Sequence, residues 1–205
     1  MEEDWSGYWR ENFCRLFRAG RFEVLPKWLD KAPDEGLLPI RIDPGMAFGG
    51  GDHPTTRLML RLLCGLEERG LLPDEVLDVG SGTGILSIAA ALLGAKRCEA
   101  LDIDPFCMAS AERNAALNGV AGKVTPLLLS LDLHGVLYRL VMANIVASQL
   151  EKLAPELKGR LAEGGILLLS GFTEDKKTIV REHFSPLRLA AESGEEGWAA
   201  LALER

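Results

Sequence analysis

The chain has 205 residues, of which 47% are hydrophobic and 26% charged, and its net charge at pH 7 is −7. These values are typical of one soluble α/β domain with a short additional segment, and they exclude a disordered or fibrous chain. The acidic charge argues against nucleic acid as the main partner, because a phosphate backbone requires a basic surface. The longest apolar stretches, such as residues 85–94, are too short to span a bilayer, so no membrane partner is expected.

The cysteines and the first residues indicate the compartment. No C-x₂-C pair or neighbouring histidine accompanies the four cysteines, which are Cys14, Cys64, Cys98 and Cys107. Neither a zinc site nor a disulfide framework is therefore predicted. The acidic start of the chain also lacks the basic-then-apolar layout of a signal peptide. We expect a cytoplasmic protein without a bound metal, and a monomer is favoured.

The predicted elements begin with an amphipathic helix at 3–18, where aromatic residues recur at spacings of three and four. Short strands at 22–25 and 38–42 follow, and from there helices and strands alternate. The later helices are predicted at 55–69, 85–93, 105–117, 148–161 and 173–183. The later strands are predicted at 75–79, 97–101, 123–129, 140–143, 166–170, 187–191 and 198–203.

This alternation predicts the fold class. Nearly continuous apolar strands separated by helices indicate a doubly wound, mostly parallel α/β sheet that is covered on both faces. The final two strands are joined by a polar Gly-Glu-Glu-Gly turn, which predicts an antiparallel closing hairpin. We expect an N-terminal helix and linker over residues 1–37, followed by a single domain over 38–205.

A glycine loop follows the strand at 75–79 and contains Gly80, Gly82 and Gly84. In a doubly wound sheet, ligands bind at the carboxyl ends of strands near the point where the strand order reverses. The dinucleotide fingerprint G-x-G-x-x-G requires a third glycine at position 85, but that residue is Ile85. Asp78, two residues before the first glycine, would repel a pyrophosphate and attract the ammonium of a methionine group. The loop therefore favours S-adenosylmethionine over NAD, and a tight turn without a ligand is the alternative.

Asp102 ends the next apolar strand, and Asp104 follows in the sequence Asp-Ile-Asp-Pro. An acidic residue at the end of the second strand can accept hydrogen bonds from both ribose hydroxyls of a nucleoside, and we assign this role to Asp102. Asp104 precedes Pro105 and is suited to capping the following helix. Helix capping is also the alternative role for Asp102.

Asn144 ends the strand at 140–143, where it would stand close to the reacting methyl group. Its carbonyl could accept a hydrogen bond from an amine substrate and orient the nitrogen lone pair. The alternative is that Asn144 caps the helix beginning near Ser148.

The segment 44–56 is rich in glycine and ends in His53-Pro54-Thr55-Thr56. Its composition indicates a loop with a role beyond spacing. A structural role is favoured for His53, because neither of the other two histidines lies in a comparable motif. The threonines open a helix, which either hydroxyl could cap, or one could reach the cofactor.

Four segments together, 44–56, 78–84, 102–105 and 143–145, resemble the bacterial PrmA family, whose members trimethylate lysine side chains and the N-terminal amine of ribosomal large-subunit protein eleven. The resemblance covers nearly the whole chain. It implies the Rossmann-like class I methyltransferase fold, with a seven-stranded sheet. It also implies that this ribosomal protein is the partner, and that cofactor contacts lie at Thr56, Gly80, Asp102 and Asn144.

Two features depart from the family pattern. Gly50 stands where the family has threonine, and the chain begins at the linker that follows the family's small recognition domain. Alternative functions therefore remain open: methylation of another protein or of a small molecule, or cofactor binding without catalysis. The predicted site contains Asn144 as the catalytic residue and cofactor-binding residues Thr56, Asp78, Gly80, Gly82, Gly84, Asp102 and Asn144.

Overall fold

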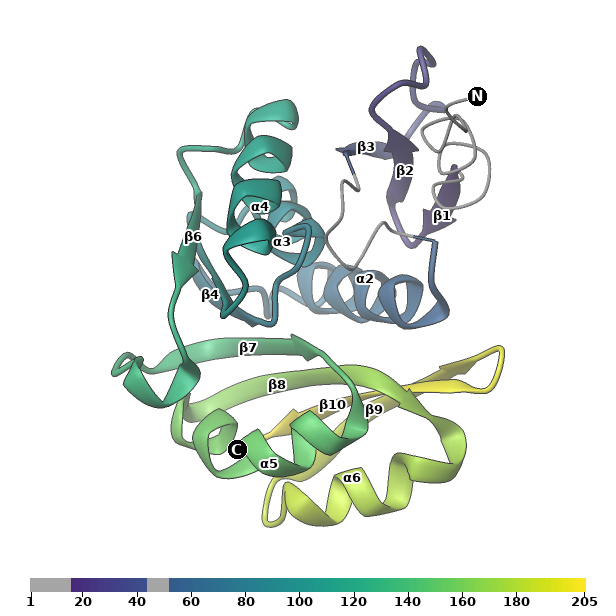
Figure 1. Ribbon diagram of the computed structural model, residues 1–205. Coiled ribbons are helices and arrows are strands. Elements are labelled where there is room, and N and C mark those ends of the chain that lie inside the picture. Colours follow the sequence, from purple (N-terminus) through teal and green to yellow (C-terminus); the bar gives the residue numbers. More distant parts are fainter. Residues whose placement is uncertain (1–15, 44–51) are drawn as a thin grey trace, which may run out of the picture.

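The computed structural model describes residues 16–43 and 52–205 (Figure 1). The predicted helix at 3–18 lies mostly outside these residues. Its last part is wrong, because Phe17–Ala19 form strand β1. The antiparallel partner of β1, Phe22–Pro26 (β2), places Phe17 opposite Val24, so pairing between strands determines this conformation.

A seven-stranded sheet forms the centre of the molecule, in the order β6-β5-β4-β7-β8-β10-β9. The strands are β4 (Glu75–Val79), β5 (Arg97–Asp102), β6 (Val124–Leu128), β7 (Tyr138–Asn144), β8 (Leu161–Thr173), β9 (Arg188–Glu195) and β10 (Trp198–Glu204). The pairs from β6 through β8 are parallel, whereas β10 is antiparallel to both β8 and β9. The predicted mostly parallel sheet with a closing hairpin is therefore confirmed. The strand order reverses at β4, which lies between β5 and β7.

Helices cover both faces of this sheet, as Figure 1 shows. One face is covered by α2 (Pro54–Glu68), α3 (Ile85–Leu93) and α4 (Pro105–Leu117), and the other by α5 (Ala147–Gly159) and α6 (Lys177–His183). Neighbouring strand residues face opposite layers, so Val76 belongs to the first hydrophobic core and Leu77 to the second. None of the helices in the described parts of the chain is long and apolar enough to cross a membrane.

A second, three-stranded sheet precedes the large one. The strands predicted at 22–25 and 38–42 are confirmed as two of its members, but their pairing into a separate sheet was not predicted. Its middle strand, β2, pairs antiparallel with β1 and parallel with β3 (Leu38–Ile42). Phe22 and Ile40 are fully buried in the same core as residues of α2, so the small sheet packs on the larger domain. The division of the chain into a segment 1–37 and a domain 38–205 stays a prediction. Strands β2 and β3 lie on opposite sides of this boundary and pair with each other.

Two predicted boundaries near α5 and α6 differ from the structure. Helix α5 ends at Gly159, and Leu161 opens β8 by pairing with Tyr138, so placing Leu161 in the helix is wrong. Residues Glu174–Lys176 form a 3₁₀ turn before α6, so the predicted helix at 173–183 starts too early. The hairpin turn that joins β9 to β10 contains Glu196 and Gly197, both with positive φ, as a two-residue hairpin connection requires.

Candidate active site

The glycine loop lies at the carboxyl end of β4, where the strand order reverses. The backbone N–H groups of Gly80 and Ser81 both donate to the carbonyl oxygen of Leu101, at 2.9 and 3.0 Å. The carboxylate of Asp102 then accepts a hydrogen bond from Gly82 N at 3.0 Å. The structure thus brings together the two strand ends that the sequence assigned to the cofactor.

Close packing around Gly80 explains the need for glycine there. A β-carbon on this residue would lie within 3.0 Å of Ile145 Cγ2, and its φ is +70°. Ile145 directly follows Asn144 at the end of β7. The glycine loop and the end of β7 are therefore in direct contact.

Asp102 and Asp104 have separate roles at the end of β5. Asp102 Oδ1 accepts from Asp104 N at 3.0 Å, while Asp104 is the N-cap of α4 and accepts from Phe106 N at 2.9 Å. The prediction that Asp104 caps this helix is confirmed. Because the cap is Asp104, the Asp102 carboxylate remains at the glycine loop, as its predicted role requires.

Asn144 does not cap the following helix. The N-cap of α5 is Val146, which makes no side-chain capping bond. The Oδ1 atom of Asn144 is buried and has no hydrogen-bond partner among the described residues. A buried acceptor without a partner is costly, so its position favours contact with a ligand over a purely structural role.

Asp78 lies beneath the glycine loop and is only 1% exposed. Its Oδ2 accepts from both the N–H (3.2 Å) and the hydroxyl (2.8 Å) of Ser87 in α3. Burial raises the pKa of Asp78 to about 7, the Ser87 hydrogen bonds oppose this rise, and the negative charge of Asp102 adds to it. Its Oδ1 has no partner within residues 16–43 and 52–205. Asp78 therefore supports α3 and keeps one acceptor available.

The start of α2 is fixed by His53 and by the β9–β10 hairpin. His53 is the N-cap of α2, accepting from Thr55 N at 3.3 Å, and its ring lies 4.6 Å from that of Trp198. The cap is thus His53 and neither threonine. Thr56 is buried in the first helical turn, and the loop containing Gly50 lies outside the described residues.

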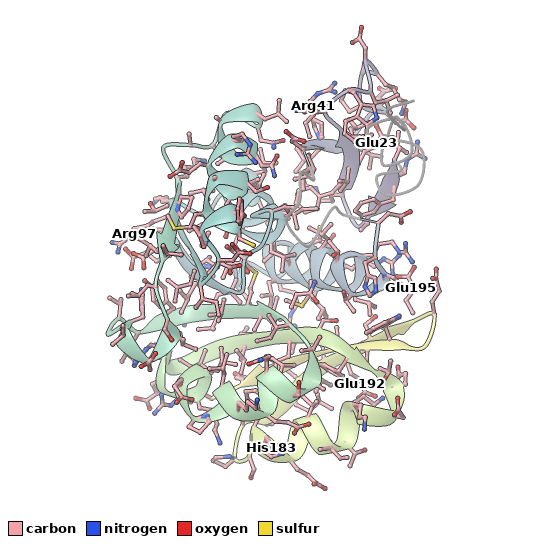
Figure 2. All side chains as sticks on the ribbon, in the orientation of Figure 1. Glu23, Arg41, Arg97, His183, Glu192 and Glu195 are labelled. Atoms are coloured by element: carbon pink, nitrogen blue, oxygen red, sulfur yellow. The ribbon has the colours of Figure 1, made fainter. Side chains whose placement is uncertain are left out.

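Ion pairs strengthen this attachment of α2. Arg57 binds Asp52, Glu195 and Glu196 at 2.7 to 2.9 Å, and only 13% of its side chain is exposed. Figure 2 shows Glu195 at the tip of the hairpin, beside α2. The start of α2 is therefore held against the β9–β10 hairpin by the ion pairs of Arg57 and by the contact between the His53 and Trp198 rings.

Strand β8 contains a bulge next to the end of β7. Ala199 pairs with Phe172 and Ala200 with Ser170, so Gly171 is the extra residue. Its φ is +97°, and a β-carbon there would lie 2.6 and 2.8 Å from Ile145 C and N. The bulge leaves space for the backbone that follows Asn144.

A second buried polar cluster joins β5 to β7 away from these loops. Glu99 accepts hydrogen bonds from the Tyr138 hydroxyl (2.6 Å) and from Arg97, and its carboxylate lies 2.7 Å from His134 Nε2. Burial opposes ionisation of Glu99, but these bonds lower its pKa to about 2. Tyr138 opens β7, whereas Asn144 closes it, so the cluster lies outside the candidate site.

The site can hold a small cationic and hydroxylated ligand. Six buried side-chain atoms lack hydrogen-bond partners in the described structure, and three of them lie at this site: Asp78 Oδ1, Ser81 Oγ and Asn144 Oδ1. Such oxygens suit an ammonium group, and the carboxylate of Asp102 suits ribose hydroxyls. The described residues contain no cluster of His, Cys, Asp or Glu that could hold a metal ion.

Comparison with known proteins decides the family. The family model described as "Ribosomal protein L11 methyltransferase (PrmA)" matches residues 1–205. The chain belongs to the PrmA family. Membership confirms the predicted S-adenosylmethionine-dependent methyltransferase class.

Curated PrmA relatives match almost the whole chain. Proteins named "Ribosomal protein L11 methyltransferase" from Geobacter sp. (strain M21) and Citrifermentans bemidjiense are 43% and 44% identical over 99% of this chain. The aligned region covers 67% of each relative, and 64% of the Trichlorobacter lovleyi protein, which is 43% identical. The chain therefore spans about two thirds of the length of these relatives.

Solved structures agree with the assignment to PrmA. The ribosomal protein L11 methylase of Lactobacillus delbrueckii subsp. bulgaricus has a TM-score of 0.82 and 34% identity, covering 94% of this chain and 97% of that one. An RNA methyltransferase from Salinibacter ruber, solved with S-adenosyl-L-homocysteine, has a TM-score of 0.57 and 22% identity, covering 70% and 89%. At that identity the second structure supports the fold alone.

Several residues that shape the site were missed by sequence reasoning: Arg57, Asn114, Ile145 and Gly171. Gly171 stands inside an apolar strand pattern, a position where glycine marks a bulge or a close approach. Asn114 lies inside α4, although asparagine is a poor former of helix interiors. A glycine inside a strand and an asparagine inside a helix were therefore the two sequence features that could have indicated these residues.

Proposed function

We propose that this PrmA-family chain transfers methyl groups from S-adenosylmethionine to lysine side chains and the N-terminal amine of ribosomal protein L11. The observation that carries the proposal is the meeting of the glycine loop, Asp102 and Asn144 where the strand order reverses. The match to the family over the full chain supports the choice of acceptor. The net charge of −7 favours a protein acceptor over nucleic acid, and the reaction is assigned to the cytoplasm.

The predicted binding residues have distinct tasks. The Asp102 carboxylate accepts hydrogen bonds from ribose hydroxyls while it holds the N–H of Gly82. The glycine loop allows close approach of the ligand, and the free oxygen of Asp78 attracts the methionine ammonium. Thr56 contributes a hydroxyl from the first turn of α2.

Asn144 acts on the acceptor amine. Its Oδ1 accepts a hydrogen bond from the amine and so directs the nitrogen lone pair. When bound, S-adenosylmethionine would supply an electrophilic methyl group to the amine nitrogen, with its sulfur as the leaving group that keeps the electrons of the broken C–S bond. Before each transfer, the protonated amine loses a proton to water, which frees the nitrogen lone pair. Alignment and exclusion of water supply the catalytic effect, without a dedicated general base.

A methyl-transfer assay tests the proposal. Purified L11 and the chain are incubated with radiolabelled S-adenosylmethionine, and mass spectrometry locates the methyl groups. Labelled lysine and N-terminal amines are expected. Cofactor binding without labelling of any protein in a ribosomal extract would support the non-catalytic alternative, and labelling of another acceptor would replace L11.

A further inference from the structure

Asn114 of α4 is fully buried and connects two segments that are distant in the sequence. Its Nδ2 donates to the carbonyl oxygens of Thr83 at 3.0 Å and Asp43 at 3.2 Å, and its Oδ1 accepts from Asp43 N at 2.8 Å. Both hydrogens of the Asn114 side-chain amide, and its carbonyl oxygen, thus form hydrogen bonds with backbone groups. A further contact, to Ser110 Oγ, is longer at 3.5 Å.

The two connected segments are the glycine loop of the candidate site and the end of β3. Thr83 lies within the glycine loop, between Gly82 and Gly84. Asp43 is the residue from which the chain enters the segment 44–56. One side chain therefore sets the spacing between the glycine loop and the start of that segment.

A second contact holds the glycine loop against the same helix. A β-carbon on Gly84 would lie 3.0 Å from Ala111 Cβ and 3.2 Å from Ala111 Cα. Ala111 is three residues before Asn114, on the same side of α4. The loop therefore has little room to move if the Asn114 hydrogen bonds are kept.

Asn118, one turn later, makes the same kind of pairing without contacting the glycine loop. Its Nδ2 donates to Arg41 O, and its Oδ1 accepts from Arg41 N, both at 2.7 Å. The two asparagines together satisfy the backbone edge of β3, as a neighbouring strand would. The Asn118 amide also donates to the carbonyl oxygen of Asn114 at 2.8 Å, but only Asn114 reaches Thr83.

We propose that Asn114 is a positioning residue for cofactor binding, because it holds the glycine loop at a fixed distance from the end of β3. The inference rests on the proposed function, since it concerns the same cofactor site. Removing its donors takes away the hydrogen bonds that Asn114 gives to the carbonyl oxygens of Thr83 and Asp43. The loop then relaxes away from its binding geometry.

Matched aspartate variants test this role. Asn114→Asp and Asn118→Asp each keep the acceptor oxygen and lose the donors. Affinity for S-adenosylhomocysteine is measured by calorimetry well below the melting temperature of each variant. We expect Kd to rise about tenfold or more for Asn114→Asp, because the glycine loop loses its hydrogen bond to α4, and less than about threefold for Asn118→Asp.

Enzyme kinetics add a readout that global destabilisation would not move. For Asn114→Asp, the KM for S-adenosylmethionine should rise while kcat for L11 at saturating cofactor stays within about threefold of wild type. A Kd unchanged by Asn114→Asp, or equal rises for both variants, would overturn the role of Asn114.

Hydrogen exchange on the wild type keeps the inference testable if Asn114→Asp does not fold. Adding S-adenosylhomocysteine should slow exchange at the N–H of Asp43 more than at that of Arg41. Equal or absent protection at Asp43 would contradict the proposal. Failure of the wild type to bind S-adenosylhomocysteine would overturn the proposed function as well, which distinguishes the two failures.

Discussion

The side chain of Ile145 lies directly against the Cα of Gly80, so that no β-carbon fits between them. Ile145, the first residue after Asn144, thus leaves room only for glycine at position 80 of the glycine loop. This contact links the loop assigned to the cofactor with the strand end assigned to the acceptor.

Gly80→Ala should weaken cofactor binding by about tenfold or more, because the new methyl group displaces either the loop or Ile145. Gly70→Ala is the matched control, since Gly70 has a φ of +68° but nothing within 4 Å of a β-carbon. Both variants place alanine at a positive φ and are strained by it, but only Gly80→Ala adds a clash with Ile145. Calorimetry with S-adenosylhomocysteine checks this, and equal affinities in the two variants would show that the clash has no consequence.

Gly171→Ala should lower kcat more than it changes cofactor affinity. A β-carbon in the bulge meets the backbone of Ile145, which follows Asn144 and cannot yield as a flexible side chain would. Gly164→Ala lies in the same strand with a φ of +66° and open space, so it serves as control. Steady-state kinetics would contradict the expectation if both variants lost the same turnover.

Asn144→Ala should reduce turnover by about 10²-fold or more and leave cofactor affinity within a few fold, because the acceptor amine loses its orienting hydrogen bond. Single-turnover methylation of L11 together with a separate measurement of cofactor Kd checks this. The opposite pattern, weak binding with normal turnover at saturation, would assign Asn144 to the cofactor alone.

Asp102→Ala should raise the cofactor Kd strongly, by about 10²-fold, since it removes a charged acceptor for two hydroxyls. Asp104→Ala, two residues away, removes only the helix cap, so it should cost about 1 kcal/mol of stability and little affinity. Calorimetry and thermal unfolding separate the two effects. Unchanged affinity in Asp102→Ala would refute its assigned role.

Asp78→Asn should remove a pH dependence of stability. The Asp78 carboxyl has a pKa of about 7 in the folded protein against 3.8 as its ordinary value, because it is buried. Between these values the unfolded chain has lost the proton and the folded chain keeps it, so this group lowers stability as pH rises from about 4 to about 7. The melting temperature of the variant should therefore exceed that of wild type increasingly over this range, with no further gain above it.

A constant difference in melting temperature between pH 5 and 8 would contradict the shifted pKa of Asp78. A second measurement addresses the ligand. If the free Asp78 oxygen binds an ammonium, the affinity for S-adenosylhomocysteine should increase with pH through 7 in wild type and stay flat in Asp78→Asn.

The seven-stranded sheet was predictable because strands such as β4, β5 and β7 are mostly buried and appear in the sequence as nearly continuous apolar runs. The order Asp78, glycine loop, Asp102 also determined the binding end, since carboxyl ends of parallel strands meet at one edge. The small sheet could not be predicted in the same way. Its strands are short, and β2 has partners on both sides that only the folded chain brings together.

The contacts that shape the site were the least predictable. Helical periodicity assigns Asn114 to a face of α4, but it does not show that the amide reaches Thr83, 31 residues earlier. Likewise, the sequence shows Gly171 only as a glycine within an apolar strand. Its close approach to the backbone of Ile145, seen only in the structure, explains why glycine is needed there. Such contacts depend on tertiary distances.

The position of β10 between β8 and β9 also has a consequence for biosynthesis. Both neighbours precede β10 in the chain, so they emerge from the ribosome before the strand that must lie between them. Until β10 inserts, the edge of β8 exposes backbone groups and apolar side chains that can recruit other chains. Truncation within Trp198–Glu204 should therefore produce aggregates during expression, even though the cofactor loops are intact.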